Sequence, residues 1–203
     1  MITDAYFEQF QTKKYRSKNP LKRAMIRRFV QTVHRLLERT GEMRTVLEIG
    51  VGEGFLSGSL LQRFPGVKLT GVDIKQDDLD LLRQKFPAIE TQCASIYELE
   101  ALPTGYDVVI CAEVLEHLED PPRALRQIKA RQPRHVLITV PHEPWFMLTN
   151  LAAGQNIRRF GNDIEHINHF SVGSLRRLLE TEFVLDEVTT SYPWILALGR
   201  PRS

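Results

Sequence analysis

Residues 46–57 read VLEIGVGEGFLS, a run of strand-forming side chains followed at once by three glycines within five positions. Gly50, Gly52 and Gly54 carry no Cβ, so a ligand can approach the backbone closely at this turn. Beyond Gly54 the apolar residues recur at helical spacing. The stretch therefore predicts a strand, a glycine turn that contacts a ligand, and a helix.

The residues around this turn indicate which ligand it binds. A dinucleotide fingerprint, Gly-x-Gly-x-x-Gly, would need a glycine where this chain has Phe55, and no Gly-Lys-Ser/Thr follows. Glu48 and Glu53 flank the turn, which disfavours an anionic pyrophosphate and favours a cationic ligand. Asp73 ends the next apolar run, where it can accept hydrogen bonds from ribose hydroxyls. The pattern predicts an adenosine-type ligand without a pyrophosphate.

Apolar strands and helical segments alternate along the middle of the chain, which predicts a parallel sheet covered on both faces. Asn19-Pro20 has the chemistry of a helix start and Gly41 that of a helix end. The expected strands are 45–50, 67–73, 88–93, 106–112 and 135–141, and the expected helices are 54–64, 76–86, 95–101 and one from Pro121.

The end of the chain departs from this alternation. Ser171 is the expected cap of a helix over 172–181, and strands are expected at 183–190 and 194–199. These two strands are joined too closely for a parallel crossover, so they must pair antiparallel. The α/β fold therefore contains seven strands within one domain spanning residues 1–203, with a helical segment at 1–40 and an insertion at 142–170.

Composition places the chain among ordinary globular proteins. It has 203 residues, of which 42% are hydrophobic and 26% charged. No stretch approaches the roughly 18 apolar residues of a membrane span, and the first residues lack the apolar core of a signal peptide. Cys93 and Cys111 are expected to be reduced and buried. We therefore expect a cytoplasmic protein.

Charge is distributed unevenly along the chain. Residues 1–40 hold ten Lys and Arg against three Asp and Glu, and residues 13–28 hold eight basic residues and no acidic one. Such a segment can attract an anionic lipid surface, nucleic acid or a phosphorylated substrate, or it can be the solvated face of a helix. Because no aromatic-rich RNA-binding signature accompanies it, nucleic acid is the least favoured of these partners.

Three stretches, in order, resemble motifs of the class I S-adenosylmethionine-dependent methyltransferases. They are VLEIGVGEG at 46–54, GVDI at 71–74 and YDVVICAEVLEHLEDP at 106–121. The last is typical of the branch that contains the ubiquinone-biosynthesis O-methyltransferases and many small-molecule enzymes. The resemblance covers roughly residues 40–140. It implies a Rossmann-like, doubly wound, mostly parallel sheet with a C-terminal antiparallel hairpin, and S-adenosyl-L-methionine as the cofactor.

The resemblance also assigns roles to the residues that follow the first two strands. Gly50, Gly52 and Gly54 would line the cofactor, and Glu48 would orient its methionine end. Asp73 would bind the ribose hydroxyls.

Further residues are assigned at the next strand ends. Ile74 would pack on the adenine, and Ala94 and Ser95 stand where the family often has an acidic residue that contacts the adenine amino group. That contact is expected either to be weakened or to pass to Ser95 and the backbone. Ala112 and Glu113 would lie near the sulfonium and the methyl acceptor.

Methyl transfer from a sulfonium is an in-line displacement, so the protein must supply alignment and, for a hydroxyl nucleophile, a proton acceptor. The candidates for this catalytic role are His117, His142 and Glu116. His117 is favoured by its position after the fourth strand, and His142 follows the fifth. Each histidine can equally be a structural imidazole. The preferred acceptor is a small molecule methylated on oxygen, because the chain lacks the Asn/Asp-Pro-Pro-Tyr motif of many N-methyltransferases.

A metal site is the alternative use of the same residues. Glu113, Glu116 and His117 would share a helical face, and with His169 they could bind a divalent cation. A similar arrangement occurs in the small-RNA 2′-O-methyltransferases, so a metal-assisted RNA methyltransferase is a second hypothesis. A catalytically silent binding subunit is a third, disfavoured by the intact glycine turn and Asp73.

The insertion carries an apolar stretch, PWFMLTNLAAG at 144–154. It is interpreted as a lid over an apolar acceptor pocket, with a membrane-surface segment or a core helix as the alternatives. Tyr192 and Trp194 are expected to be core aromatics at strand ends. No pattern in the chain indicates an oligomeric state.

Overall fold

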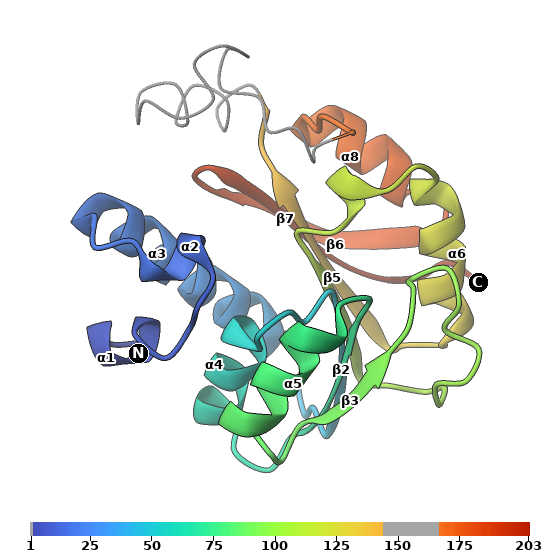
Figure 1. Cartoon of the computed structure of the whole chain (residues 1–203). Helices are drawn as coiled ribbons and strands as arrows, with labels where there is room; N and C mark the ends of the chain where they lie inside the picture. The colour runs from blue at the N-terminus through green and yellow to red at the C-terminus, as the bar shows by residue number, and fades with distance from the viewer. Residues whose placement is uncertain (1, 144–166) are drawn as a thin grey trace.

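The computed structural model describes residues 2–143 and 167–203, which form one seven-stranded sheet with helices on both faces (Figure 1). The strand order is β3-β2-β1-β4-β5-β7-β6. The five strands β1 to β5 pair in parallel, whereas β7 runs antiparallel to β5 and β6. The predicted sheet and its C-terminal hairpin are thereby confirmed. The bounds are β1 Thr45–Ile49, β2 Lys68–Asp73, β3 Glu90–Cys93, β4 Val108–Ala112, β5 His135–Pro141, β6 Phe183–Ser191 and β7 Trp194–Pro201.

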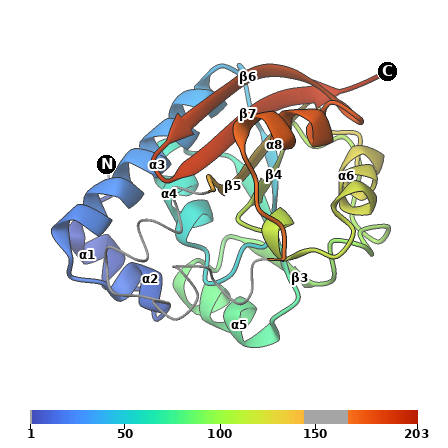
Figure 2. The same ribbon diagram turned by 90° about the horizontal axis from the view of Figure 1, so that it is seen from above.

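The helices divide between the two faces of the sheet, as in a doubly wound fold. The core on one face includes side chains from α1, α3, α4 and α5, and the core on the other includes side chains from α6 and α8. Figure 2 shows α3 and α4 on one side of the sheet and α6 and α8 on the other. The bounds are α1 Asp4–Phe7, α2 Lys13–Arg16, α3 Pro20–Glu38, α4 Phe55–Arg63, α5 Gln76–Lys85, the 3-10 helix η1 Leu115–His117, α6 Pro121–Ala130 and α8 Val172–Leu179.

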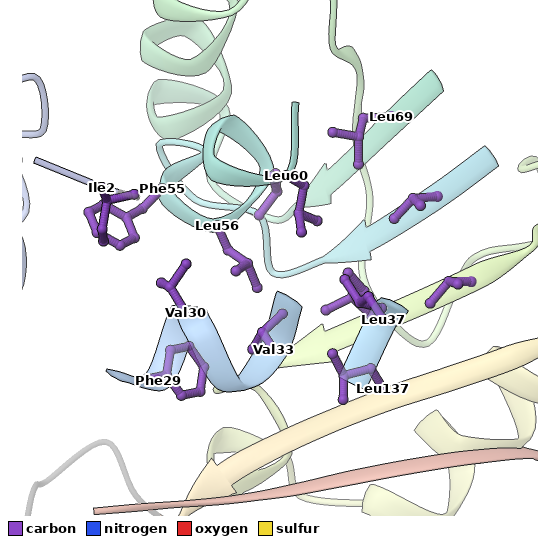
Figure 3. Packing of buried hydrophobic residues seen from close by; sticks show 14 of the residues in the cluster. Ile2, Phe29, Val30, Val33, Leu37, Phe55, Leu56, Leu60, Leu69 and Leu137 are labelled. Atoms are coloured by element: carbon purple, nitrogen blue, oxygen red, sulfur yellow. The ribbon is translucent and has the colours of Figure 1, made fainter. Parts of the chain in front are cut away.

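Helix α3 begins where the sequence predicts. The Asn19 side chain accepts hydrogen bonds from the backbone N–H groups of Leu21 (2.9 Å) and Lys22 (3.2 Å), and Pro20 occupies the first helical turn. The apolar side of α3 packs on α4 and the sheet, where Val33 and Leu37 are fully buried (Figure 3). This core holds the N-terminal residues against the carboxyl-terminal ends of the parallel strands, where the glycine turn follows β1.

The expected helix over 95–101 was wrong: these residues form a series of turns. The Ser95 hydroxyl accepts a hydrogen bond from the Tyr97 N–H (3.2 Å), and the Ser95 carbonyl accepts one from the Glu98 N–H (2.9 Å). These short local bonds compete with a continuous helical pattern. The chain instead approaches β4 through separate turns.

The expectation that both cysteines are buried holds only for Cys111. Cys93 is exposed, because it ends β3, the edge strand of the sheet, and both thiols are free.

Most of the expected insertion 142–170, including the apolar stretch 144–154, lies outside the described residues. Among the helices that the structure describes, none is long and apolar enough to cross a membrane.

Candidate active site

The glycine turn joins β1 to α4 and has a backbone conformation that demands glycine. Gly50 and Gly54 have φ angles of 74° and 81°, in the left-handed region. A Cβ at Gly50 would lie 2.3 Å from Val114 Cγ2, and one at Gly54 would lie 2.4 Å from Leu82 Cδ1. The turn is therefore held tightly between neighbouring side chains. At Gly52, between them, a Cβ would meet nothing within 4 Å, so the backbone is bare on that side.

Asp73 is hydrogen-bonded to this turn. One carboxylate oxygen of Asp73 accepts the Gly52 N–H at 2.8 Å, and the other accepts the Lys75 N–H at 2.9 Å. An ionised carboxylate has about four acceptor positions, so two remain for hydroxyl donors. The strand end that the sequence selected as a ribose-binding position therefore lies directly against the glycine turn.

Glu48 points into the space beside the turn and is almost completely buried, with 3% exposure. Burial raises the pKa of its carboxyl to about 8, although a hydrogen bond from the Ser57 hydroxyl acts in the opposite direction. A buried carboxyl of this kind becomes ionised more readily when a cation binds beside it.

Glu53 has a different task from the one expected. Its carboxylate accepts hydrogen bonds from the backbone N–H groups of Gln11 (2.8 Å) and Thr12 (2.7 Å), and forms an ion pair with Lys85 at 2.5 Å. Burial alone would raise the pKa of Glu53, but these donors lower it. The acidic charge that seemed available to a cationic ligand is instead used to attach the N-terminal segment to the glycine turn.

The attached segment covers the site. The Tyr15 ring stacks on Phe55 at the start of α4, with ring centroids 3.8 Å apart and an interplanar angle of 3°. The Tyr6 hydroxyl donates a 2.6 Å hydrogen bond to the Phe55 carbonyl. Sequence reasoning missed this arrangement. The only local signal for it in the sequence was a set of four aromatic residues near the start of residues 1–40, namely Tyr6, Phe7, Phe10 and Tyr15.

A cavity of about 190 Å³ lies between the turn and this segment. Its walls combine residues from the sheet edge with residues from the N-terminal segment, and they include Thr12, Lys14, Tyr15, Glu48, Gly50, Gly52, Ala112, Glu113 and Trp194. Five residues expected to touch the cofactor do not line this cavity: Gly54, Asp73, Ile74, Ala94 and Ser95. The last three lie beyond Asp73, at the ends of β2 and β3. Ile74 is 69% exposed there.

Glu113 is held at one wall of the cavity by two partners. It directly follows β4 with a left-handed φ of 60°. Its Oε2 accepts a 2.6 Å hydrogen bond from the Trp194 indole N–H and lies 3.5 Å from the Lys14 ammonium. Burial is the largest single influence on the pKa of Lys14 and acts to lower it. Glu113, Tyr15 and Glu116 together outweigh burial and keep this pKa above its usual value.

The Trp194 ring is buried as expected, although its contact with Glu113 was not foreseen. The expectation that Tyr192 is a core aromatic was wrong, because the residue is 45% exposed.

None of the three candidate proton acceptors lines the cavity. Glu116 is 1% exposed, and neither of its carboxylate oxygens has a hydrogen-bond partner within residues 2–143 and 167–203. Burial, together with the charge of Glu113, raises its pKa well above the usual value. Its Oε1 lies 4.0 Å from His117 Nε2. His142 is half-buried after β5, and burial lowers its pKa.

The helical face proposed for a metal site was wrong. The 3-10 helix η1 begins only at Leu115, and the left-handed φ of Glu113 turns the chain before it, so Glu113 does not continue the helical face of Glu116 and His117. His169 is exposed. In the part of the chain that the structure describes, no three His, Cys, Asp or Glu side chains are gathered so that they could hold a metal ion.

Comparison with known proteins places this geometry in a family. A family model described as a methyltransferase domain matches residues 21–182. The chain belongs to the methyltransferase domain family. The resemblance found in the sequence is thereby confirmed at the level of the family.

Individual relatives of this methyltransferase chain agree. The ubiquinone biosynthesis O-methyltransferase of Idiomarina loihiensis is 37% identical over 83 residues, which cover 38% of this chain and 33% of that protein. The chain thus matches about a third of the length of this curated relative.

Two solved structures share the fold. Magnesium protoporphyrin IX methyltransferase from Synechocystis PCC 6803, with bound S-adenosyl-L-homocysteine, has a TM-score of 0.71 at 19% identity and covers 98% of this chain and 94% of its own. The N-methyltransferase NodS from Bradyrhizobium japonicum, also in complex with S-adenosyl-L-homocysteine, has a TM-score of 0.69 at 17% identity, with coverages of 98% and 97%.

The family match also divides the site into two parts. Glu48, Gly50, Gly52 and Glu113 line the cavity from inside the matched range 21–182, whereas Thr12, Lys14 and Tyr15 lie before it. The common methyltransferase framework therefore supplies one side of the cavity, and a segment outside the matched range supplies the other.

Proposed function

We propose that the protein transfers the methyl group of S-adenosyl-L-methionine to a hydroxyl oxygen of a small-molecule acceptor. The observation that carries this proposal is the hydrogen bond between Asp73 and the Gly52 N–H, beside the buried carboxyl of Glu48. Membership of the methyltransferase domain family supports the reaction class. The names of the curated relatives support oxygen as the methylated atom.

The cofactor would extend along the sheet edge. Asp73 would accept hydrogen bonds from the ribose hydroxyls, and Gly50 and Gly52 would let the nucleoside contact the backbone. Glu48 would face the ammonium of the methionine end, because its buried carboxylate needs a cation to stay ionised. The adenine would lie beyond Asp73, against Ile74 and the backbone of Ala94 and Ser95.

The reaction forms one carbon–oxygen bond and breaks one carbon–sulfur bond. The acceptor oxygen attacks the methyl carbon in line with sulfur, giving the methylated acceptor and S-adenosyl-L-homocysteine, and the hydroxyl proton passes to a base. The methyl group would be presented at Ala112 and Glu113, where the cavity continues toward Lys14 and Trp194.

We place the proton acceptor in the neighbouring pair Glu116 and His117. The buried Glu116 carboxyl has no hydrogen-bond donor among the described residues, and its raised pKa favours the protonated form. Glu116 would therefore serve as the base only after it loses its proton, and the ionised form would then be a strong base. His117 Nε2 lies 4.0 Å away and is exposed, so a proton can continue from it to solvent. His142 is the second candidate for the base, at the end of β5.

Single substitutions separate these assignments. We expect Glu116→Gln or His117→Gln to lower turnover roughly 10²- to 10⁴-fold with unchanged cofactor affinity, as loss of a general base does. His142→Gln serves as the comparison. Turnover would be followed by release of S-adenosyl-L-homocysteine from a panel of phenols, catechols and sugars. If no member of the panel is methylated and titration with S-adenosyl-L-methionine gives no heat, the silent-subunit hypothesis replaces this proposal.

The remaining hypotheses rank lower. No relative or solved structure named above is an RNA methyltransferase, so nothing there supports the metal-assisted RNA alternative. Contact with an anionic membrane surface and a cytoplasmic location stay predictions.

A further inference from the structure

A basic groove lies next to the cavity. It has a volume of about 520 Å³ and is formed by α2, the residues on either side of it and the first turn of α3. We call it the α2 groove, and its lining residues are Gln11, Lys13, Arg16, Ser17 and Lys22. Three of the five side chains are cationic, and none is acidic.

Within residues 2–143 and 167–203, no acidic side chain neutralises the positive charge of the α2 groove. No acidic residue occurs between Glu8 and Glu38 in the sequence. Other basic side chains of the same region have partners: Arg23 and Arg27 pair with Asp4 at 2.7 and 2.5 Å. In contrast, no ion pair within the described residues involves Lys13, Arg16 or Lys22, the three cations of the groove.

The pKa of Lys22 is affected by the neighbouring positive charge. This pKa is lowered, first by partial burial and then by the charge of Lys14. The charge of Lys14 therefore adds to the effect of burial, and the ammonium of Lys22 is less favourable than in water. An anion bound between Lys13, Arg16 and Lys22 would offset the repulsion from Lys14.

The α2 groove and the cavity are two sides of one segment. Thr12, Lys14 and Tyr15 line the cavity, whereas Lys13, which lies between them, and Arg16, which follows them, line the groove. Glu53 fixes this segment to the glycine turn through the backbone of residues 11 and 12. Only this segment therefore separates a ligand in the groove from the space in which the methyl group would be transferred.

We propose that the α2 groove binds a phosphate group and that this phosphate is carried by the methyl acceptor. The second half rests on the proposed methyl transfer; the first half does not. Arg16 offers a planar fork for two phosphate oxygens, and Lys13 and Lys22 add point charges. The Ser17 hydroxyl and the Gln11 amide can donate to the remaining oxygens. The phosphate belongs either to a phosphorylated small molecule or to a lipid headgroup.

Direct binding tests the groove with probes of known chemistry. Phenyl phosphate would be titrated calorimetrically into the full chain, and vesicles of phosphatidylcholine with phosphatidylglycerol would be tested by co-sedimentation. The groove variant combines Lys13→Gln, Arg16→Gln and Lys22→Gln. Its matched control combines Lys68→Gln, Arg126→Gln and Arg177→Gln, which removes the same charge from exposed positions on β2, α6 and α8.

We expect at least one probe to bind the wild type saturably, and the groove variant to lose at least tenfold in affinity while the control keeps it. Binding of phenyl phosphate alone indicates that the groove takes the phosphate of a soluble small molecule, and binding of vesicles alone indicates that it takes a lipid headgroup. Binding that is absent for both probes, or that is equal in the groove variant and the control, overturns the proposal. Thermal unfolding of both variants verifies that they are folded.

A parallel titration with S-adenosyl-L-methionine separates the two proposals. We expect the groove variant to bind this cofactor as the wild type does. If the wild type binds phosphate but not the cofactor, phosphate binding by the α2 groove is supported and the proposed methyl transfer is refuted. If it binds the cofactor but not phosphate, the proposed phosphate site is refuted and the proposed methyl transfer is not.

Discussion

Replacing Glu48 by Gln should change how the stability of the free protein depends on pH. The carboxyl of Glu48 has its pKa raised by burial from an ordinary value of 4.5 to about 8. Between these two values the folded protein keeps a proton that the unfolded chain has lost. The contribution of Glu48 is therefore complete below pH 4.5 and is lost as pH rises toward 8.

The magnitude follows from the size of the shift. Each pH unit in this window removes about 1.4 kcal/mol of unfolding free energy. Between pH 5 and pH 8 the wild type should lose about 4 kcal/mol through this one group. A glutamine side chain cannot ionise, and its amide oxygen can still accept the Ser57 hydroxyl, so Glu48→Gln should abolish that loss.

Urea unfolding of the two proteins at pH 5, 6, 7 and 8, without cofactor, measures the difference. Contributions of other titrating groups, Glu116 among them, are common to both proteins and cancel. We expect the unfolding free energy of the variant, relative to that of the wild type, to rise steadily with pH, by about 4 kcal/mol between pH 5 and pH 8. A stability difference that is the same at pH 5 and pH 8 would mean that Glu48 is already ionised in the free protein, and the electrostatic argument for a cationic ligand would fail.

Two further predictions concern the turn and its attached segment. Gly50→Ala should lower the midpoint of thermal unfolding more than Gly41→Ala does. Both positions have left-handed φ angles, but only a Cβ at Gly50 would lie 2.3 Å from Val114. Equal shifts of the two midpoints would contradict the close packing of the turn. Glu53→Gln should speed tryptic cleavage within residues 11–16 several-fold by weakening the attachment of that segment, measured by mass spectrometry under native conditions; an unchanged cleavage rate would show that other contacts hold it.

Local patterns accounted for the sheet and for half of the site. The alternation of apolar runs and helices determines a parallel sheet, and strand ends in such a sheet meet at one edge. For this reason the sequence could place Gly50, Gly52 and Asp73 together. Asn19 and Ser171 were also identifiable, because capping depends on residues two or three positions away.

The other half of the site depends on contacts between distant parts of the chain. Glu53 binds backbone groups 41 and 42 positions earlier, and Trp194 binds a carboxylate 81 positions earlier. Contacts between residues so far apart leave no periodic pattern in the sequence. The left-handed φ of Glu113 is a similar case, since this conformation is uncommon for a residue other than glycine. The expected helical face of Glu113, Glu116 and His117 was wrong for that reason.

Calorimetric titration with S-adenosyl-L-methionine tests the central claim most directly. The wild type should bind one equivalent saturably. Asp73→Ala should weaken binding at least about tenfold, since a hydrogen bond to a charged group is worth about 1.5–3 kcal/mol. Asp77→Ala removes the same charge from an exposed position on α5 and should leave affinity unchanged. If the wild type gives no binding heat, or if Asp73→Ala binds as tightly as Asp77→Ala, the glycine turn and Asp73 do not form the cofactor site.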